Sequence, residues 1–209
     1  MRVRVGITTL LSVVMLATSI QALAQKSAAP LTIAIFADRQ LPAAEWSALT
    51  AAVDTERSAA MPALAHTPLQ VLRGDTIKPG IVVDHSISVF LHGHCELVPR
   101  VSSTASAHVT GALGWTASRD GQLEPFAHVD CDRIALLLAP RTIGMSRGQR
   151  SRAMAIAVAH VILHEWSHIA TQSAHHSEHG LTKSAFSAQD LLGTSPQPVE
   201  PAGDLGQAR

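Results

Sequence analysis

The sequence of 209 residues has no tyrosine, only four phenylalanines and only two cysteines, and its 16 basic residues are balanced by 16 acidic ones. Without an excess of lysine and arginine, the chain carries no electrostatic footprint for nucleic acid or for an anionic membrane surface. Nucleic-acid binding is therefore excluded as a function class. The scarcity of tyrosine and phenylalanine gives no indication of a specificity pocket, and no internal repeat is present.

The first residues have the layout of a secretory signal peptide. Arg2 and Arg4 form a positively charged start, an apolar run follows at 5–20, and a small-residue cleavage signal ends at Ala24. The apolar run is interrupted by hydroxyl side chains and is shorter than the roughly 20 residues that span a bilayer, which argues against a membrane anchor. We expect residues 1–24 to be removed, leaving an exported protein, periplasmic or secreted, with no stable membrane anchor.

The rest of the chain has the length of one domain with a real hydrophobic core. Once the two N-terminal arginines are removed, 14 basic and 16 acidic residues remain, so the net charge is near −2. The proline-rich segment after Gly193 has nothing to bury. We therefore expect one domain at 25–193 and a disordered tail at 194–209.

Hydrophobic periodicity predicts an α+β domain. Short apolar or alternating runs predict strands at 31–36, 69–72, 86–91, 112–116 and 123–131, and longer runs with a helical period predict helices at 42–58, 132–139 and 147–171. Asp120-Gly121 is a two-residue hairpin signal between the last two strands. Ser146 and Gln149 have the spacing of a capping box at the start of the long helix. We expect a twisted mixed sheet, with the N-terminal helix packed on it and the long helix below.

Cys95 and Cys131 each end a predicted strand. In an exported chain, a disulfide is the default pairing of two cysteines. A thiolate metal ligand or a nucleophile is the alternative, because His92 and His94 lie beside Cys95 and leave a second metal site open. We expect the disulfide.

The chemistry-bearing motif is His164-Glu165-Trp166-Ser167-His168, which lies within the long helix. Histidines four residues apart leave the same face of a helix, so two neutral nitrogens can reach one tetrahedral zinc ion at about 2.0–2.1 Å. Glu165 is placed to take the proton of a metal-activated water and to return it to the leaving amine. The same string also arises by chance in unrelated proteins, but its position in an apolar helix favours a metal site.

The third metal ligand is not decided by spacing. A hydrolytic zinc site usually has three protein ligands and one open position. The pattern of the metzincins would require glycine at 171 and histidine at 174, and Thr171 and Ala174 exclude a strict metzincin. The remaining candidates are His175, His176, Glu178, His179 and Asp190.

The motif at 164–168 is followed by a second run at 176–183 (His-Ser-Glu-His-Gly-Leu-Thr-Lys) and a third at 186–191 (Phe-Ser-Ala-Gln-Asp-Leu). This series resembles a group of exported bacterial zincin-like proteins, whose pattern is His-Glu-x-x-His, a turn, His-Ser-x-x-Gly-[Ile/Leu/Val]-Met-[Lys/Arg], an aromatic residue and Asp-Leu. The region 111–133 is also similar. The resemblance implies a zincin-like metallopeptidase fold with His176 as the third zinc ligand.

The chain departs from the family pattern at two positions: Thr182 stands where the family has methionine, and Gln172 stands near a usual glycine. We expect Zn2+ to be bound by His164, His168 and His176, and a peptide or protein substrate to be hydrolysed with Glu165 as base and acid. The alternatives are a non-catalytic exported zinc-binding protein on the same scaffold, which the departure from methionine favours, and an interaction module without metal.

Several further histidines are expected to have other roles. His160 lies one turn before His164, but a straight helix carries its imidazole about 6 Å further along the axis, so we expect a core histidine or a partner of a ligand. Trp166 and Ile169 are expected in the core. The remaining histidines near strands are expected at the surface: His92, His94, His108 and His128.

Overall fold

The computed structural model describes residues 30–78, 86–97 and 111–193. The predicted signal peptide at 1–24, the predicted tail at 194–209 and His108 lie outside the described residues.

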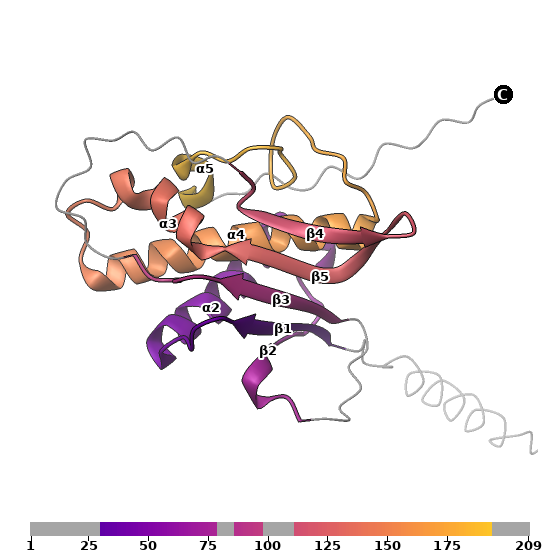
Figure 1. Ribbon diagram of the computed structural model, residues 1–209, viewed down its shortest axis with the longest axis horizontal. Coiled ribbons are helices and arrows are strands. Elements are labelled where there is room, and N and C mark those ends of the chain that lie inside the picture. Colours follow the sequence, from indigo (N-terminus) through magenta and orange to yellow (C-terminus); the bar gives the residue numbers. More distant parts are fainter. Residues whose placement is uncertain (1–29, 79–85, 98–110, 194–209) are drawn as a thin grey trace, which may run out of the picture.

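Five strands form one mixed sheet in the order β2-β1-β3-β5-β4 (Figure 1). Neighbouring strands run parallel except β4, which lies at one edge and is antiparallel to β5. Asp120 and Gly121 both adopt positive φ, 54° and 79°, as a tight two-residue hairpin between β4 and β5 requires. The strands are β1 (Leu31–Ala37), β2 (Leu69–Arg73), β3 (Ser86–His92), β4 (Gly114–Arg119) and β5 (Gln122–Asp130).

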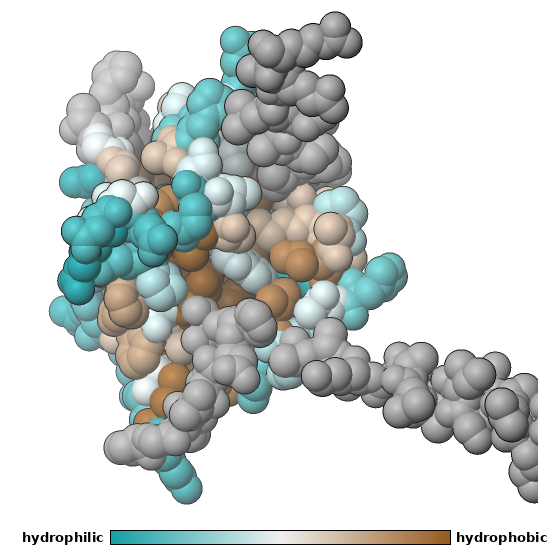
Figure 2. Space-filling model, turned by 90° about the vertical axis from the view of Figure 1, so that its right-hand side faces the viewer, coloured by the Kyte–Doolittle hydropathy of each residue, from teal (hydrophilic) through white to brown (hydrophobic). Residues whose placement is uncertain are grey.

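The helices α2 and α4 pack against each other and lie on the same side of the sheet (Figure 1). Alternate residues of the central strands, such as Ile33, Val89 and Val129, join the buried apolar cluster with both helices. The predicted mixed sheet and helices are therefore confirmed. In the side view of Figure 2, hydrophobic surface gathers in the middle of the face and hydrophilic side chains surround it. The helices are α2 (Ala43–Ala60), α3 (Cys131–Leu138), α4 (Arg147–Thr171) and α5 (Ala188–Leu192), with 3-10 turns at Pro62–Leu64, Gly74–Thr76 and Ala139–Arg141.

The helix α4 is the centre of the fold. Its predicted capping box is present: Gln149 N donates to Ser146 Oγ at 3.3 Å, and Ser146 N donates to Gln149 Oε1 at 2.8 Å. Within the described part of the chain, α4 alone is long and apolar enough to cross a membrane, but 89% of its most apolar window is buried inside the fold. It is accordingly a core helix, and Trp166 and Ile169 are buried in it as expected.

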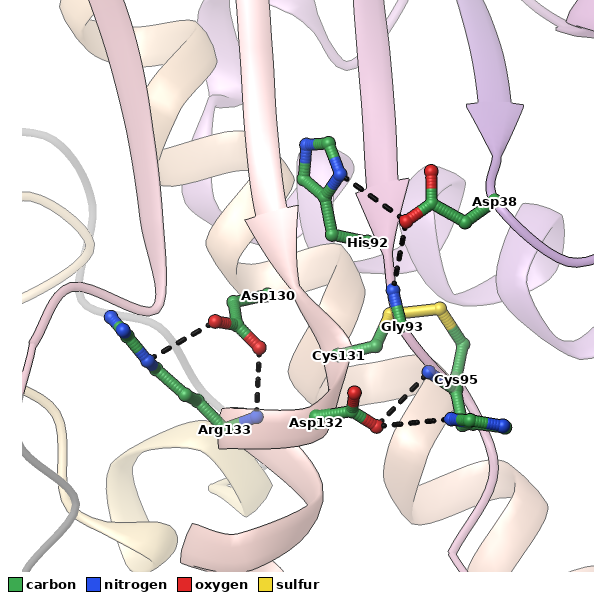
Figure 3. Close-up of a disulfide and its surroundings, with 9 residues drawn as sticks. Asp38, His92, Gly93, Cys95, Asp130, Cys131, Asp132 and Arg133 are labelled. Atoms are coloured by element: carbon green, nitrogen blue, oxygen red, sulfur yellow. Dashed lines mark hydrogen bonds and ion pairs between the residues drawn. A yellow bond between two sulfur atoms is a disulfide. The ribbon is translucent and has the colours of Figure 1, made fainter.

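The predicted pairing of the two cysteines is confirmed, with 1.98 Å between the Sγ atoms of Cys95 and Cys131 (Figure 3). The turn that carries Cys95 is held by two carboxylates. Gly93 N donates to Asp38 Oδ2 at 3.1 Å, and His94 N donates to Asp132 Oδ1 at 3.0 Å. A side chain at position 93 would collide with Asp132, since an added Cβ would lie 2.2 Å from Asp132 Oδ2. The disulfide thus joins the turn after β3 to the first turn of α3.

Candidate metal centre

Three histidines meet at the C-terminal half of α4. His164 and His168 leave one face of the helix, and His176 comes from the segment that follows it. One ligand atom from each lies within 4.8 Å of the others. The first two are buried, at 7% and 5% exposure, and His176 is exposed at the mouth of the site. The structure therefore brings together a group that could hold a metal ion.

The turn that returns His176 to the helix depends on Gln172. This residue ends α4 in the left-handed conformation, with φ 51°. Its side chain binds the main chain of Leu123 at the start of β5, accepting from the amide at 2.9 Å and donating to the carbonyl at 3.1 Å. Gln172 Nε2 also donates to Ile169 O at 2.8 Å. The side chain of Gln172, which stands near a usual glycine of the zincin-like pattern, therefore anchors the turn to the sheet.

A second short loop closes the site beside His164. Ser177 N donates to Thr182 O at 3.1 Å, and the two hydroxyls are 2.8 Å apart. Leu181, which is 1% exposed, lies between them in sequence, and its carbonyl oxygen is 2.7 Å from His164 Nδ1. The hydroxyl of Thr182, which stands where the zincin-like pattern has methionine, thus takes part in holding this loop.

Two carbonyl contacts determine the protonation of the buried imidazoles. His164 Nδ1 lies 2.7 Å from Leu181 O, and His168 Nδ1 lies 2.6 Å from Ser173 O. Carbonyl oxygens only accept, so both Nδ1 atoms must carry the donated proton. In neutral rings the Nε2 atoms are then bare lone pairs, and these two atoms are 3.0 Å apart.

Two facing lone pairs need a positive charge between them. A proton is disfavoured, because burial lowers the pKa of His164 to about 4. A metal ion is favoured, since two nitrogens that each lie about 2.0–2.1 Å from one tetrahedral ion are separated by about 3.3 Å. The donor set therefore fits a bound metal ion.

Comparisons with known protein families, curated proteins and solved structures find no match. The zincin-like resemblance therefore stays a prediction, and the function has to be inferred from the geometry of the site.

Glu165 lies beside the cluster without joining it. Its carboxylate oxygen is 3.9 Å from His164 Nε2, and the residue is 4% exposed. Burial raises the pKa of Glu165 to about 7. A cation held by the histidines would lower this pKa again, because opposite charge favours the ionised form.

Gly114 allows the edge strand to run directly against this carboxylate. A Cβ at position 114 would lie 2.8 Å from Glu165 Oε1 and 2.6 Å from Val161 Cγ1. Real Cβ atoms do not approach neighbours this closely, so only glycine fits without a shift of β4 or α4. Sequence reasoning did not single out Gly114 as part of the site. The signal that could have found it is a glycine at the start of a strand that is otherwise well predicted.

A cavity of about 420 Å³ opens over the three histidines and Glu165. Its walls combine the edge strand, the face of α4 and the loop after it. The histidines, Glu165, Thr116 and Ser184 supply polar lining, and the apolar lining comes from Leu113, Leu123, Leu137, Val161 and Phe186. The cavity thus combines the histidine cluster and Glu165 with an apolar surface that a substrate side chain could contact.

The other candidate ligands have different roles. Asp190 accepts from Lys183 Nζ at 2.7 Å and caps α5 through Ser187. His160 is 3% exposed, has no hydrogen-bond partner for either ring nitrogen among the described residues, and lies edge-on to Phe186. It is a core histidine, as predicted. The cluster also includes none of the remaining candidates, His175, Glu178 and His179.

Proposed function

We propose that the protein is an exported zinc-dependent hydrolase of zincin type that cleaves peptide or related amide bonds. The observation that carries the proposal is the pair of buried imidazoles in one helical face, with bare Nε2 atoms 3.0 Å apart, beside a buried carboxylate that stays outside the cluster. A structural zinc site would use a fourth protein ligand, whereas a hydrolytic site keeps one position open. Three histidines at the wall of an open cavity match the hydrolytic arrangement.

The protein residues would divide the chemistry between binding and proton transfer. His164, His168 and His176 would hold the ion through one nitrogen each. Zinc, when bound, would polarise the scissile carbonyl and lower the pKa of a water to roughly 7. Glu165 would accept the proton of the attacking water and deliver it to the leaving nitrogen, because its carboxylate lies 3.9 Å from His164 Nε2 without joining the cluster.

The edge strand supplies a surface for an extended substrate. Among the described residues, β4 is paired on one side only, with β5, and residues Gly114–Thr116 line the cavity. An extended peptide could add to this free edge by main-chain hydrogen bonds. Such a peptide would pass alongside the Glu165 carboxylate, because Gly114 contacts it.

The alternative is a non-catalytic exported zinc-binding protein on the same scaffold. Thr182 in place of methionine favours it, because the residue that the resemblance expects under the metal is absent. In that case the histidines would still bind zinc, and Glu165 would have no role in proton transfer.

Replacement of Glu165 by glutamine separates the two functions. In the proposed enzyme, Glu165→Gln should lower peptide hydrolysis by about 10²- to 10⁴-fold while stoichiometric zinc is retained. The assay is cleavage of a mixed peptide library followed by mass spectrometry, with zinc measured on protein purified without an affinity tag. Glu178→Gln, in an exposed carboxylate outside the cluster, is the matched control and should stay active.

Equal hydrolysis by Glu165→Gln and the unaltered protein would refute the catalytic role. Stoichiometric zinc without any hydrolysis would favour the non-catalytic alternative. Loss of zinc in His164→Ala, His168→Ala and His176→Ala, with Glu178→Gln unaffected, should confirm the ligand set. Absence of zinc from the unaltered protein would refute the metal site itself.

Export is tested separately. The proposal expects the mature protein to be recovered from the periplasm or the medium with a new N-terminus at Gln25, which N-terminal sequencing measures. Recovery of the chain with residues 1–24 still attached would contradict it.

A further inference from the structure

The face of the sheet that points away from α2 and α4 carries a continuous row of rings. Phe36, Phe90, His128 and Trp115 lie on β1, β3, β5 and β4, and each is the register partner of the next. The chain has only four phenylalanines and three tryptophans, and four of these seven lie on this face, since Phe126 is beside the row. The aromatic side chains are thus concentrated on a surface that the buried core does not use.

The rings of this row stand face to face across the strands. The centroids of Phe36 and Phe90 are 5.2 Å apart, those of Phe90 and His128 are 5.1 Å apart, and those of His128 and Trp115 are 5.1 Å apart. The ring planes of these pairs differ by 17°, 20° and 5°. This spacing matches the distance of about 4.7–4.9 Å between neighbouring strands. One further strand would therefore place a side chain at stacking distance from the last ring.

The two ends of the row differ. At the β1 end, the main chain at Gly74 sits on the ring of Phe36, since a Cβ there would lie 2.1 Å from that ring. At the β4 end, Trp115 is on the edge strand and is 41% exposed. Its stacking partners among the described residues, His92 and His128, come from β3 and β5, on the inner side. Within the described part of the chain, the row is therefore closed at the Phe36 end and open at the Trp115 end.

A hydrogen-bonded pair of histidines holds Trp115 in place. His92 Nδ1 is 3.4 Å from Asp38 Oδ2, and His92 Nε2 is 3.0 Å from His128 Nδ1. The ring planes of His92 and His128 differ by 12°. The plane of the Trp115 indole differs from that of His92 by 12° and from that of His128 by 5°. The orientation of the indole is therefore set before any ligand arrives, which lowers the entropy cost of stacking on it.

The open end of the row adjoins the candidate active site. Trp115 lies between Gly114 and Thr116, and all three line the cavity above Glu165. Cross-strand neighbours share a face of the sheet, so a peptide added to β4 would place one side chain opposite Trp115. The neighbouring side chains of that peptide would point to the other face, towards the cleft.

We propose that Trp115 is a specificity-determining residue that selects peptide substrates with an aromatic side chain at the single position opposite it. The inference rests on the proposed function for its link to hydrolysis. An aromatic side chain continues the stack, and aromatic pairs contribute roughly 2- to 12-fold in an equilibrium constant beyond their area of contact. An alanine at that position leaves the outer face of the indole in water.

The test uses the full chain carrying Glu165→Gln, loaded with zinc, so that peptides bind without being cleaved. Immobilised protein captures peptides from a capped octapeptide library in which one position at a time is phenylalanine or alanine, and mass spectrometry measures the enrichment. We expect phenylalanine to be enriched about 2- to 12-fold over alanine at one position of the octapeptide. The enrichment should disappear when Trp115→Ala is added and persist in part with Trp115→Phe.

Phe126→Ala is the matched control. Phe126 is 40% exposed on the same face, but it lies on β5 rather than at the free edge. Its removal should leave the positional enrichment unchanged. Circular dichroism of each variant verifies that the fold is retained, and Trp115→Phe keeps the test decisive if Trp115→Ala does not fold.

Equal capture of the two kinds of peptide, or an enrichment that survives Trp115→Ala, would overturn the inference. Dimerisation of the free protein that Trp115→Phe and Trp115→Ala abolish would also overturn it, because a second copy would then occupy the edge. Trp115-dependent capture without cleavage by the unaltered protein would instead remove the proposed hydrolysis and leave the inference intact. Cleavage without any preference for an aromatic residue would support the proposed hydrolysis and overturn the role of Trp115 in specificity.

Discussion

Replacement of Gly114 by alanine should force β4 and α4 apart at the point where Glu165 lies. The added Cβ would be 2.6 Å from Val161 Cγ1, 2.8 Å from Glu165 Oε1 and 3.0 Å from the carbonyl oxygen of His128. Unstrained contacts to carbon need about 3.5–4.0 Å. Val161 is 1% exposed and, as a β-branched residue in a helix, has essentially one rotamer, so it cannot turn aside. The strand or the helix must therefore move by about 1 Å.

The expected magnitudes follow from this displacement. Overpacking of a well-packed core costs about 1–3 kcal/mol. For a domain of this size, the melting temperature should fall by roughly 2–12 °C. A shift of about 1 Å in a catalytic group can lower a reaction rate by about 10²-fold. Zinc content should stay close to that of the unaltered protein, because none of the three histidines takes part in the contact.

Calorimetry, zinc analysis and peptide hydrolysis measure these three quantities on one preparation. Gly148→Ala is the matched control, since nothing lies within 4 Å of a Cβ built at position 148 in the first turn of α4. That variant should be as stable as the parent protein or more stable by up to about 1 kcal/mol. A Gly114→Ala protein that melts with the parent protein and hydrolyses peptides at the same rate would refute the close approach of β4 to Glu165.

Three further predictions concern stability. In protein freed of metal by a chelator, the contribution of Glu165 to the free energy of unfolding should be lost as the pH rises from 4.5 to about 7. Over that interval the folded state keeps the carboxyl proton of Glu165 and the unfolded state loses it. The free energy of unfolding of Glu165→Gln, measured in urea, should therefore exceed that of the parent protein by up to about 3 kcal/mol at pH 8 and equal it at pH 4. The same difference at both pH values would contradict this. Gln172→Ala should lower the free energy of unfolding in urea by about 1–3 kcal/mol, because it removes the bonds to Leu123 and keeps the positive φ. Gln172→Gly should lower it by about 1 kcal/mol less, because glycine adopts the positive φ without strain. The opposite order of the two variants would show that the turn is not strained. Reduction of the disulfide between Cys95 and Cys131 should lower the free energy of unfolding by about 4 kcal/mol and leave zinc content unchanged, since neither cysteine lines the cavity; release of zinc on reduction would argue against that separation.

Most strands and helices were predictable because their signals are local. The alternation of Ile87, Val89 and Leu91 predicted β3, and positive φ at Asp120-Gly121 confirms the hairpin. The start of α3 was predicted one residue late, because Asp130 caps the helix by accepting from Arg133 N, which places Cys131 in its first turn. The order of the strands was not predicted, since it depends on which strands meet across long loops.

The third histidine of the cluster could not be predicted from the spacing of residues. Spacing left His175, His176, Glu178, His179 and Asp190 as candidates, because a loop of several residues can return in many ways. The structure brings His176 to His164 and His168 after the left-handed turn at Gln172, whose side chain binds a strand 49 residues away in sequence. The alternative of a second metal site at Cys95 fails, because that thiol is consumed by the disulfide.

What the sequence determined by itself is the geometry within one helix and one pairing. Residues 164, 165 and 168 must share a face or a neighbouring position wherever the helix lies, because its period is fixed by backbone hydrogen bonding, and two cysteines allow only one disulfide within the chain. The tertiary structure was needed to show which residue completes the histidine cluster, which strand lies at the edge of the described sheet beside Glu165, and which rings meet across the sheet. Those features depend on contacts between segments far apart in the chain, which no local pattern of residues specifies.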